Sequence, residues 1–226
     1  PRFNPFFIPK MIADIAPGNI SIKNGFMGPN YTTVSACASS ANAMIDALNY
    51  IRLGHCDVIV TGGSEAAVTI AGMGGFNAMH ALSTRNESPE TASRPFDATR
   101  DGFVLGEGAG AIILEDYEHA KARGAKIYAE ITGYGATSDG HDMVQPSGEG
   151  AVRCMNQALK TMDGEIDYIN SHGTSTPIGD LKELEAIKKV FPNKSPHISS
   201  TKSLTGHSLG ATGVHETIYS LLMLNN

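Results

Sequence analysis

The stretch VSACASSANAMIDALNYIRLGHCDVIVTGG, residues 34–63, decides the fold class of this chain. Residues 38–53 predict an α-helix, because apolar side chains recur at the spacing of one helical face and Gly54 follows as a stop. These side chains are Ala41, Met44, Ile45, Leu48 and Ile51. Residues 57–61, DVIVT, form a short β-branched run before two glycines and predict a buried strand. A helix followed directly by a buried strand is typical of an α/β protein.

The alternation of helix and strand continues along the rest of the chain. The pattern predicts a strand at 108–115, a helix at 117–123, a strand at 127–134, a helix at 149–162, a strand at 166–170, a helix at 180–191, a strand at 197–200 and a helix at 207–224. No internal repeat interrupts it. We therefore expect an α/β layered fold, divided near Gly124 into residues 1–123 and 124–226.

The composition is that of an ordinary globular protein. The 226 residues are 41% hydrophobic and 18% charged, so a large core is feasible and disorder is not expected. The net charge of -6 provides no general attraction for nucleic acid or an anionic membrane, and no apolar run approaches the roughly 18 residues of a membrane span. Cys37, Cys56 and Cys154 have no CxxC spacing, which argues against a disulfide framework or a zinc site and favours the cytoplasm.

The two ends of the sequence resemble the interior of a domain. Residues 6–12 are apolar without a preceding start signal, and the apolar run 218–224 stops at Asn225 with no partner following it. We therefore expect this chain to be a fragment of a longer protein.

Cys37 lies where an extended segment is expected to turn into a helix of small residues. The unpaired N–H groups at such a helix start would favour the thiolate over the thiol. Ala36, Ala38 and Ser39 leave room for a sharp turn and for a substrate carbonyl. The alternative is a structural cysteine, because free cysteine is often simply buried.

Two histidines lie in loops that follow predicted strands. His172 is in NSHGTSTPIGD, residues 170–180, with threonine hydroxyls two and four residues further on. His207 is in SSTKSLTGHSLGATG, residues 199–213, five residues after Lys202. A helix starting at His207 would disfavour its cationic form and keep the imidazole neutral. Each of these side chains could instead be an ordinary hydrogen-bonded or solvated surface group.

Together the three segments resemble the signature segments of β-ketoacyl-[acyl-carrier-protein] synthases I and II. The resemblance extends through GGFNAMHALSTRN (74–86), ASRPFD (92–97) and RDGFVLGEGAG (100–110). The part up to Glu107 is more similar to synthase II, and residues 138–155 and 171–187 are more similar to synthase I, so the subtype stays open. Members of this family are nearly twice this length and have a thiolase-like layered α-β-α-β-α fold.

The resemblance implies a decarboxylating condensation without a required cofactor. Cys37 would accept an acyl group from the phosphopantetheine arm of an acyl carrier protein. His172 and His207 would stabilise the enolate formed when malonyl carrier protein loses carbon dioxide. Lys202 would hold the histidine environment, supported by Glu183 and Asp180.

The resemblance also implies binding roles and an assembly. Thr174 and Thr176 would bind the phosphopantetheine arm, Phe76 and Met73 would line the acyl pocket, and Arg2 would dock the carrier protein. A structural sodium or potassium ion would lie near Asn170, Ser171 and Glu216. The protein would be a cytoplasmic homodimer that binds neither nucleic acid nor membrane.

Several other classes share part of this pattern. Thiolases use a second cysteine motif that is not visible here, and synthases of the Cys-His-Asn type place Asn where this chain has His207. Catalytically inactive chain-length factors have lost the nucleophile, whereas Cys37 is present. Polyketide ketosynthases share the Cys-His-His set and stay as the alternative function.

Overall fold

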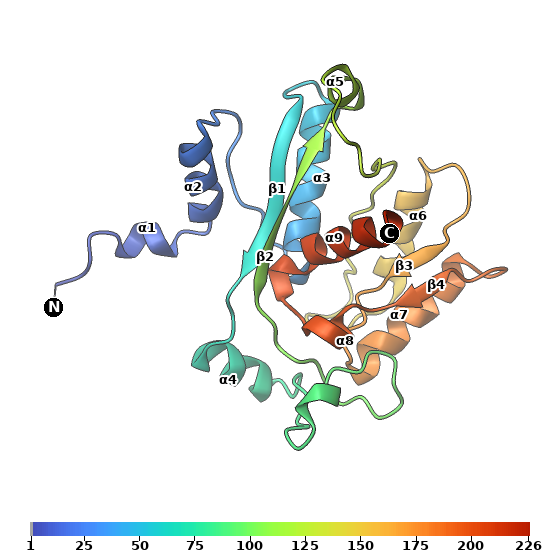
Figure 1. Ribbon diagram of the computed structural model, residues 1–226. Helices are drawn as coiled ribbons and strands as arrows, with labels where there is room; N and C mark the ends of the chain where they lie inside the picture. The colour runs from blue at the N-terminus through green and yellow to red at the C-terminus, as the bar shows by residue number, and fades with distance from the viewer. Residues whose placement is uncertain (1) are drawn as a thin grey trace.

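The computed structural model describes residues 2–226 and contains helices and strands in mixed order (Figure 1). In chain order the elements are α1 (Phe7–Met11), α2 (Ile15–Asn24), the 3-10 turn η1 (Ala36–Ala38), α3 (Ser39–Arg52), β1 (Val58–Glu65), α4 (Ile70–Ala78), η2 (Pro89–Thr91), β2 (Gly108–Glu115), α5 (Tyr117–Ala122), α6 (Glu149–Leu159), β3 (Tyr168–Asn170), α7 (Pro177–Val190), β4 (His197–Ser199), α8 (Lys202–Thr205), η3 (Leu209–Ala211) and α9 (Thr212–Leu224). The predicted α/β class is confirmed.

The first sheet is an antiparallel pair of the two long strands. β1 and β2 pair over their whole length, from Val58 opposite Glu115 to Glu65 opposite Gly108. Gly63 of β1 allows a close approach, because a Cβ there would lie 2.8 Å from the Ser40 Cβ and 3.1 Å from the Gly210 oxygen. The sheet therefore holds the start of α3 and the turn before α9 close together.

The second sheet is a short parallel pair, and α9 runs between the two sheets (Figure 1). Tyr168 to Asn170 of β3 pair with His197 to Ser199 of β4. On α9, Val214 is fully buried and its N–H donates to the Ser40 hydroxyl of α3 at 3.0 Å. The two sheets, with α3 and α9 between them, bring the loops after β3 and β4 toward the start of α3.

Most of the predicted elements are confirmed, with shifts of a few residues at their ends. The strand at 108–115 has the predicted bounds, and the helix predicted at 38–53 spans Ser39–Arg52. The strand predicted at 127–134 is wrong. A strand needs a paired neighbour as well as an apolar pattern, and no described residue forms a ladder with this segment.

The helix predicted from His207 begins five residues later. Gly206 has φ +68° and Leu209 has φ +43°, and neither value fits a right-handed helix. His207 therefore lies between α8 and η3 rather than at a helix start. The division of the chain near Gly124 stays a prediction.

Among the described residues, no helix combines the length and the apolar character needed to cross a membrane.

Candidate active site

Cys37 lies in a sharp turn at the start of α3. The turn η1 begins at Ala36, which has φ +50°, a left-handed conformation that costs of order 1 kcal/mol outside glycine. The Ser39 hydroxyl holds this turn, because it accepts from the Ser35 N–H at 2.9 Å and donates to the Ala36 carbonyl at 2.7 Å. The predicted elbow is present, and it directs the sulfur toward the loop that carries His207.

Contrary to the expected thiolate, the surroundings of Cys37 favour the thiol. Burial raises the pKa of Cys37, and the positive charge of Lys202 opposes this rise. Glu65 and Glu216 raise the pKa further through their negative charges. The expectation was wrong because the helix start cannot compensate for the loss of water around the sulfur.

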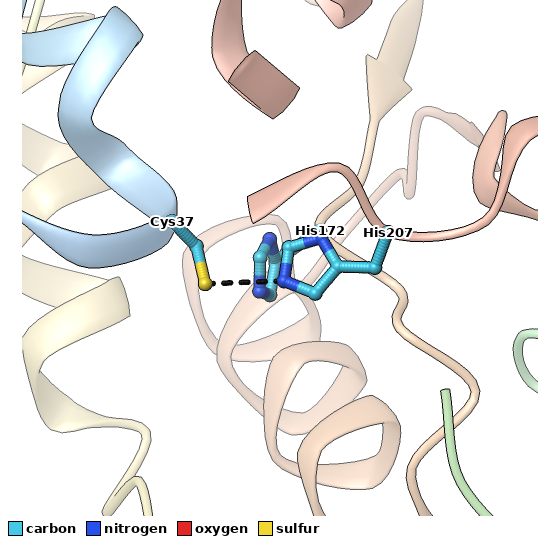
Figure 2. A group of neighbouring side chains, drawn as sticks. All are labelled: Cys37, His172 and His207. Carbon is cyan, nitrogen blue, oxygen red and sulfur yellow. Dashed lines mark hydrogen bonds between the residues drawn. The ribbon is translucent and has the colours of Figure 1, made fainter. Parts of the chain in front are cut away.

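His207 is buried beside the sulfur, with 3% of its surface exposed. Its backbone N–H donates to the Val104 carbonyl at 2.8 Å, and its ring packs edge-on against Phe103 with the centroids 5.4 Å apart. Nε2 lies 3.1 Å from the Cys37 sulfur, within hydrogen-bond distance (Figure 2). The β-bridge between Leu105 and His207, with the Phe103 contact, therefore holds the imidazole against the Cys37 sulfur.

His207 is neutral, as expected, although for a different reason. Burial lowers the pKa of His207 to about 4, and the charge of Lys202 lowers it further in the same direction. No helix begins at His207, so the helix dipole is not the cause.

His172 follows β3 and completes the group. Its backbone N–H and that of Gly173 donate to the two carboxylate oxygens of Glu183, each at 2.7 Å. Although part of His172 is exposed, its surroundings lower its pKa to about 3 through burial and then through the charges of Lys202 and His207. Both imidazoles are therefore neutral at pH 7, with one N–H and one lone pair each.

The three side chains converge although 135 and 35 residues separate them in the sequence (Figure 2). The two imidazole rings are nearly perpendicular at 88°, with centroids 5.1 Å apart. One nitrogen of each ring and the sulfur lie within 4.8 Å of one another. A single bound thioester group can contact all three.

Lys202 is a buried cation next to this group, with 2% of its surface exposed. Its ammonium forms an ion pair with Glu216 of α9. Burial raises the pKa of Glu183, and it raises the pKa of Glu216 to about 7, while Lys202 lowers both. Lys202 therefore pairs with Glu216, whereas Glu183 accepts from the backbone of His172 and Gly173, so the expected partnership of Lys202 with Glu183 stays a prediction.

Asp180 joins the loop that carries Thr174 and Thr176 to the segment around Phe96. Its carboxylate accepts from the Phe96 N–H at 2.7 Å and from the Ser175 N–H at 3.1 Å. The hydroxyls of Thr174 and Thr176 lie 3.0 Å apart. The two threonines are therefore held side by side, and their binding of phosphopantetheine stays a prediction.

The remaining predicted binding residues are spread more widely. Phe76 on α4 packs edge-on against Phe103, with centroids 5.2 Å apart, and Phe103 in turn contacts His207. Met73 is 42% exposed on the same helix. Arg2 is exposed in the irregular segment before α1, so the structure does not bring it to the three converging side chains.

Two of the expected cation ligands, Asn170 and Ser171, are adjacent in the sequence and make different hydrogen bonds. The Asn170 amide donates to the Glu216 carbonyl at 3.4 Å, and its Oδ1 is buried with no hydrogen-bond partner among residues 2–226. The Ser171 hydroxyl donates to the Ser199 carbonyl at 3.0 Å.

Two residues of the third motif were missed from the sequence alone: Thr212, which contacts the His207 ring, and Ser208, which contacts Thr212. Nδ1 of His207 lies 3.1 Å from the Thr212 hydroxyl, which lies 3.4 Å from the Ser208 hydroxyl. Ser208 and Thr212 follow His207 by one and five residues, and this spacing alone gives no recognisable signal. Their position relative to the His207 ring depends on the turn η3 between them.

The chain matches the family models for the N-terminal domain of β-ketoacyl synthase over residues 2–120 and for its C-terminal domain over residues 128–226. It is 56% identical over 223 residues to the 3-oxoacyl-[acyl-carrier-protein] synthase 1 of Haemophilus influenzae, covering 98% of this chain and 55% of that protein. It is 49% identical over 232 residues to the corresponding synthase 2 of Staphylococcus aureus, covering 100% of this chain and 57% of that protein.

A solved ketosynthase in complex with its type II polyketide acyl-carrier protein has a very similar fold. The TM-score is 0.92 at 36% identity, over 97% of this chain and 56% of that chain. The expected thiolase-like layered fold is therefore confirmed. The chain spans about half the length of the relatives that it matches.

Proposed function

The chain belongs to the β-ketoacyl synthase family, and from this membership we propose that it carries the reacting residues of a 3-oxoacyl-[acyl-carrier-protein] synthase of fatty acid elongation. The observation that carries this proposal is the contact of the Cys37 sulfur with Nε2 of His207 at 3.1 Å, beside a second neutral imidazole. The protein would be an acyltransferase that joins an acyl thioester to a malonyl unit.

In the first half-reaction Cys37 attacks the thioester of an acyl carrier protein. The new sulfur–carbon bond forms as the phosphopantetheine thiol leaves with a proton. The negative charge of the tetrahedral intermediate develops on the former carbonyl oxygen, and the Cys37 N–H is positioned to donate to it. Lys202 assists because its charge lowers the pKa of the thiol and so favours the nucleophilic form.

In the second half-reaction the malonyl group loses carbon dioxide. The electrons of the broken carbon–carbon bond move to the thioester oxygen, and the enolate carbon then attacks the acyl group on Cys37. The new carbon–carbon bond forms as the acyl–sulfur bond breaks, and Cys37 leaves as a thiolate that takes up a proton. His172 and His207 would each donate an N–H to the enolate oxygen. Because their low pKa values keep both imidazoles neutral, they stabilise this charge without giving up a proton.

The test separates the two half-reactions in the full-length protein. We expect His172→Ala and His207→Ala to lower carbon dioxide release about a hundredfold, since the loss of one donor to such an oxygen costs about 3 kcal/mol. Acyl transfer to position 37, followed with a radiolabelled acyl carrier protein, should fall much less. Cys37→Ala should abolish acyl transfer and leave some malonyl decarboxylation.

Circular dichroism provides the folding control for each variant. If His207→Ala lowers acyl transfer and carbon dioxide release equally while the fold is intact, His207 activates the thiol and the division of roles is wrong.

Sequence similarity favours a function in fatty acid elongation over the polyketide alternative. Relatives at 49% to 56% identity bear the names 3-oxoacyl-[acyl-carrier-protein] synthase 1 and 2, whereas the polyketide ketosynthase is 36% identical. Product analysis with malonyl carrier protein should give a 3-oxoacyl thioester two carbons longer than the acyl substrate; repeated extension without reduction would favour the polyketide function.

The proposed partners are an acyl carrier protein and a second copy of the chain, in the cytoplasm. The ketosynthase structure solved with its acyl-carrier protein supports the first partner. Exposed apolar side chains on α1 and α2 support the second, and three free cysteines are compatible with a reducing compartment. Light scattering and cross-linking to carrier protein would test both contacts.

A monovalent cation would fit the unpaired Oδ1 of Asn170, next to the Glu216 carbonyl. The Ser171 hydroxyl oxygen is the third expected ligand. We expect potassium or sodium to raise the melting temperature relative to a large organic cation, and Asn170→Leu to remove the difference.

A further inference from the structure

A chain of buried hydroxyl groups leads from the catalytic histidine to a second histidine on α9. Nδ1 of His207 lies 3.1 Å from the Thr212 hydroxyl, which lies 3.4 Å from the Ser208 hydroxyl, and this in turn lies 3.0 Å from Nδ1 of His215. Thr212 and Ser208 are each 4% exposed. The opposite nitrogen of His207 contacts the Cys37 sulfur. The chain therefore connects to the face of His207 that points away from the substrate.

The position of His215 is defined by close packing. The backbone of Gly108, the first residue of β2, leaves space for the ring, because a Cβ there would lie 2.6 Å from Cε1 of His215. The ring of Tyr219, one helical turn further along α9, lies 6.3 Å from it between centroids. His215 is therefore held where Nδ1 faces Ser208.

Each hydroxyl has one proton, so the hydrogen bonds between His207 and His215 can all run in one of two opposite directions. In one, Nδ1–H of His215 donates to Ser208, Ser208 donates to Thr212, and Thr212 donates to Nδ1 of His207. His207 then carries its own proton on Nε2. In the other direction every donor is reversed, and Nε2 of His207 is an acceptor.

The state of Cys37 selects between the two directions. A thiol can donate its proton to Nε2, but an acylated sulfur has none. In the acyl-enzyme, only the direction with the proton on Nε2 lets His207 donate toward the reacting groups. This is the form that the decarboxylation step requires.

We propose that Thr212, Ser208 and His215 are positioning residues that hold His207 in the Nε2–H tautomer during decarboxylation. This inference rests on the proposed function and adds three side chains to it. Their hydroxyl and imidazole groups act through His207 and do not touch the substrate.

The test uses the full-length protein with its cysteine acylated. We expect Thr212→Val, which keeps the side-chain shape and removes the hydroxyl, to lower carbon dioxide release from malonyl-pantetheine roughly tenfold, with acyl transfer to Cys37 changed by less than about twofold. Thr212→Ser should keep the wild-type rate, because it restores the hydroxyl. Ser208→Ala should resemble Thr212→Val.

The matched control is Thr217→Val on the same helix. The Thr217 hydroxyl donates to the Gly213 carbonyl at 2.8 Å. This variant therefore removes a threonine hydroxyl from α9 without changing the hydrogen bonds between His207 and His215. His215→Asn places an amide N–H where Nδ1–H stood and should stay active, whereas His215→Leu should lose rate.

Nitrogen-15 spectra of the His207 ring provide a readout that does not depend on turnover. The wild-type acyl-enzyme should show a protonated Nε2, and Thr212→Val should change the Nδ1 signal or mix the two tautomers. Unchanged His207 signals together with an unchanged rate in Thr212→Val would overturn the proposal. If the wild-type protein releases no carbon dioxide, the proposed function fails, and the His207 signals still decide whether the chain sets the tautomer.

Discussion

At the scale of single residues, burial has more influence than local sequence on the candidate site. Cys37, His172 and His207 are all shifted toward their neutral forms mainly by the loss of water around them. Lys202 is the buried positive charge beside them, and it favours a thiolate and neutral imidazoles. The candidate site therefore combines a thiol and two imidazoles that are all shifted toward their uncharged forms.

A pH dependence of stability follows from His207. Burial lowers the pKa of His207 from 6.5 to about 4, so between these values the unfolded chain binds more protons than the folded one. Its contribution to stability is complete above pH 6.5 and is lost as the pH falls toward 4, at a slope of up to about 1.4 kcal/mol per pH unit.

Urea unfolding of the full-length protein at several pH values measures this slope. His207→Gln should reduce the slope between pH 4 and 6.5 and leave the part due to His172, whose pKa is also lowered, and Thr217→Val should leave the slope as it is. Equal slopes in the wild type and His207→Gln would show that His207 does not carry the dependence.

At the scale of elements, α7 holds two loops of the site through one carboxylate. Asp180 is 1% exposed and accepts from the backbone of Phe96 and Ser175, whose φ values are +67° and +71°. Nε of Arg100 lies 3.4 Å from the same carboxylate and donates to the Thr176 carbonyl at 3.0 Å. The carboxylate compensates for two strained backbone positions and for a buried guanidinium.

Asp180→Ala should therefore be strongly destabilising. It leaves the N–H groups of Phe96 and Ser175 without their acceptor and the Arg100 guanidinium without its nearby negative charge, and we expect the free energy of unfolding to fall by about 3 to 5 kcal/mol. Asp180→Asn keeps one acceptor oxygen and should cost less.

The control is Glu185→Ala on the same helix. Glu185 pairs with Lys182 at 2.9 Å, but its side chain is 63% exposed, so we expect a loss below about 0.5 kcal/mol. Similar losses in Asp180→Ala and Glu185→Ala would contradict the role assigned to the buried carboxylate.

At the scale of the whole molecule, the N-terminal part presents apolar side chains that the rest of the chain does not cover. They include Phe3, Phe6, Ile8 and Met11, which are between 65% and 74% exposed. In Figure 1, α1 and α2 lie outside the two sheets. The chain spans about half the length of its relatives. We therefore expect these exposed side chains to pack against further polypeptide or against a second copy of the chain.

The 226-residue chain alone should self-associate. We expect it to bind 8-anilinonaphthalene-1-sulfonate strongly and to elute as an oligomer in size-exclusion chromatography with light scattering, whereas the full-length protein should bind the dye weakly. Serine at Phe6 and Ile8 should reduce the association. A monodisperse monomer with no dye binding would show that this surface is not adhesive.

The helix Ser39–Arg52 and the strand Gly108–Glu115 could be predicted because their patterns are local. The segment 127–134 has an equally apolar pattern, and the prediction failed because pairing depends on a neighbour that the pattern does not contain. The helix expected at His207 failed for a related reason. The positive φ of Leu209 belongs to the packing of η3 against β1 and is not visible in the residue types.

The sequence alone was enough to single out Cys37, His172 and His207 as candidates, through three motifs in order, and to indicate the family that the comparisons show. The tertiary structure was needed to find that burial raises the pKa of Cys37 and lowers the pKa of both histidines, and that Thr212 and Ser208 lie behind His207. The types of residue and their order in the sequence identify the chemical groups that are available to the site. A pKa and a hydrogen-bond partner depend on the water removed and the groups brought close by distant parts of the chain.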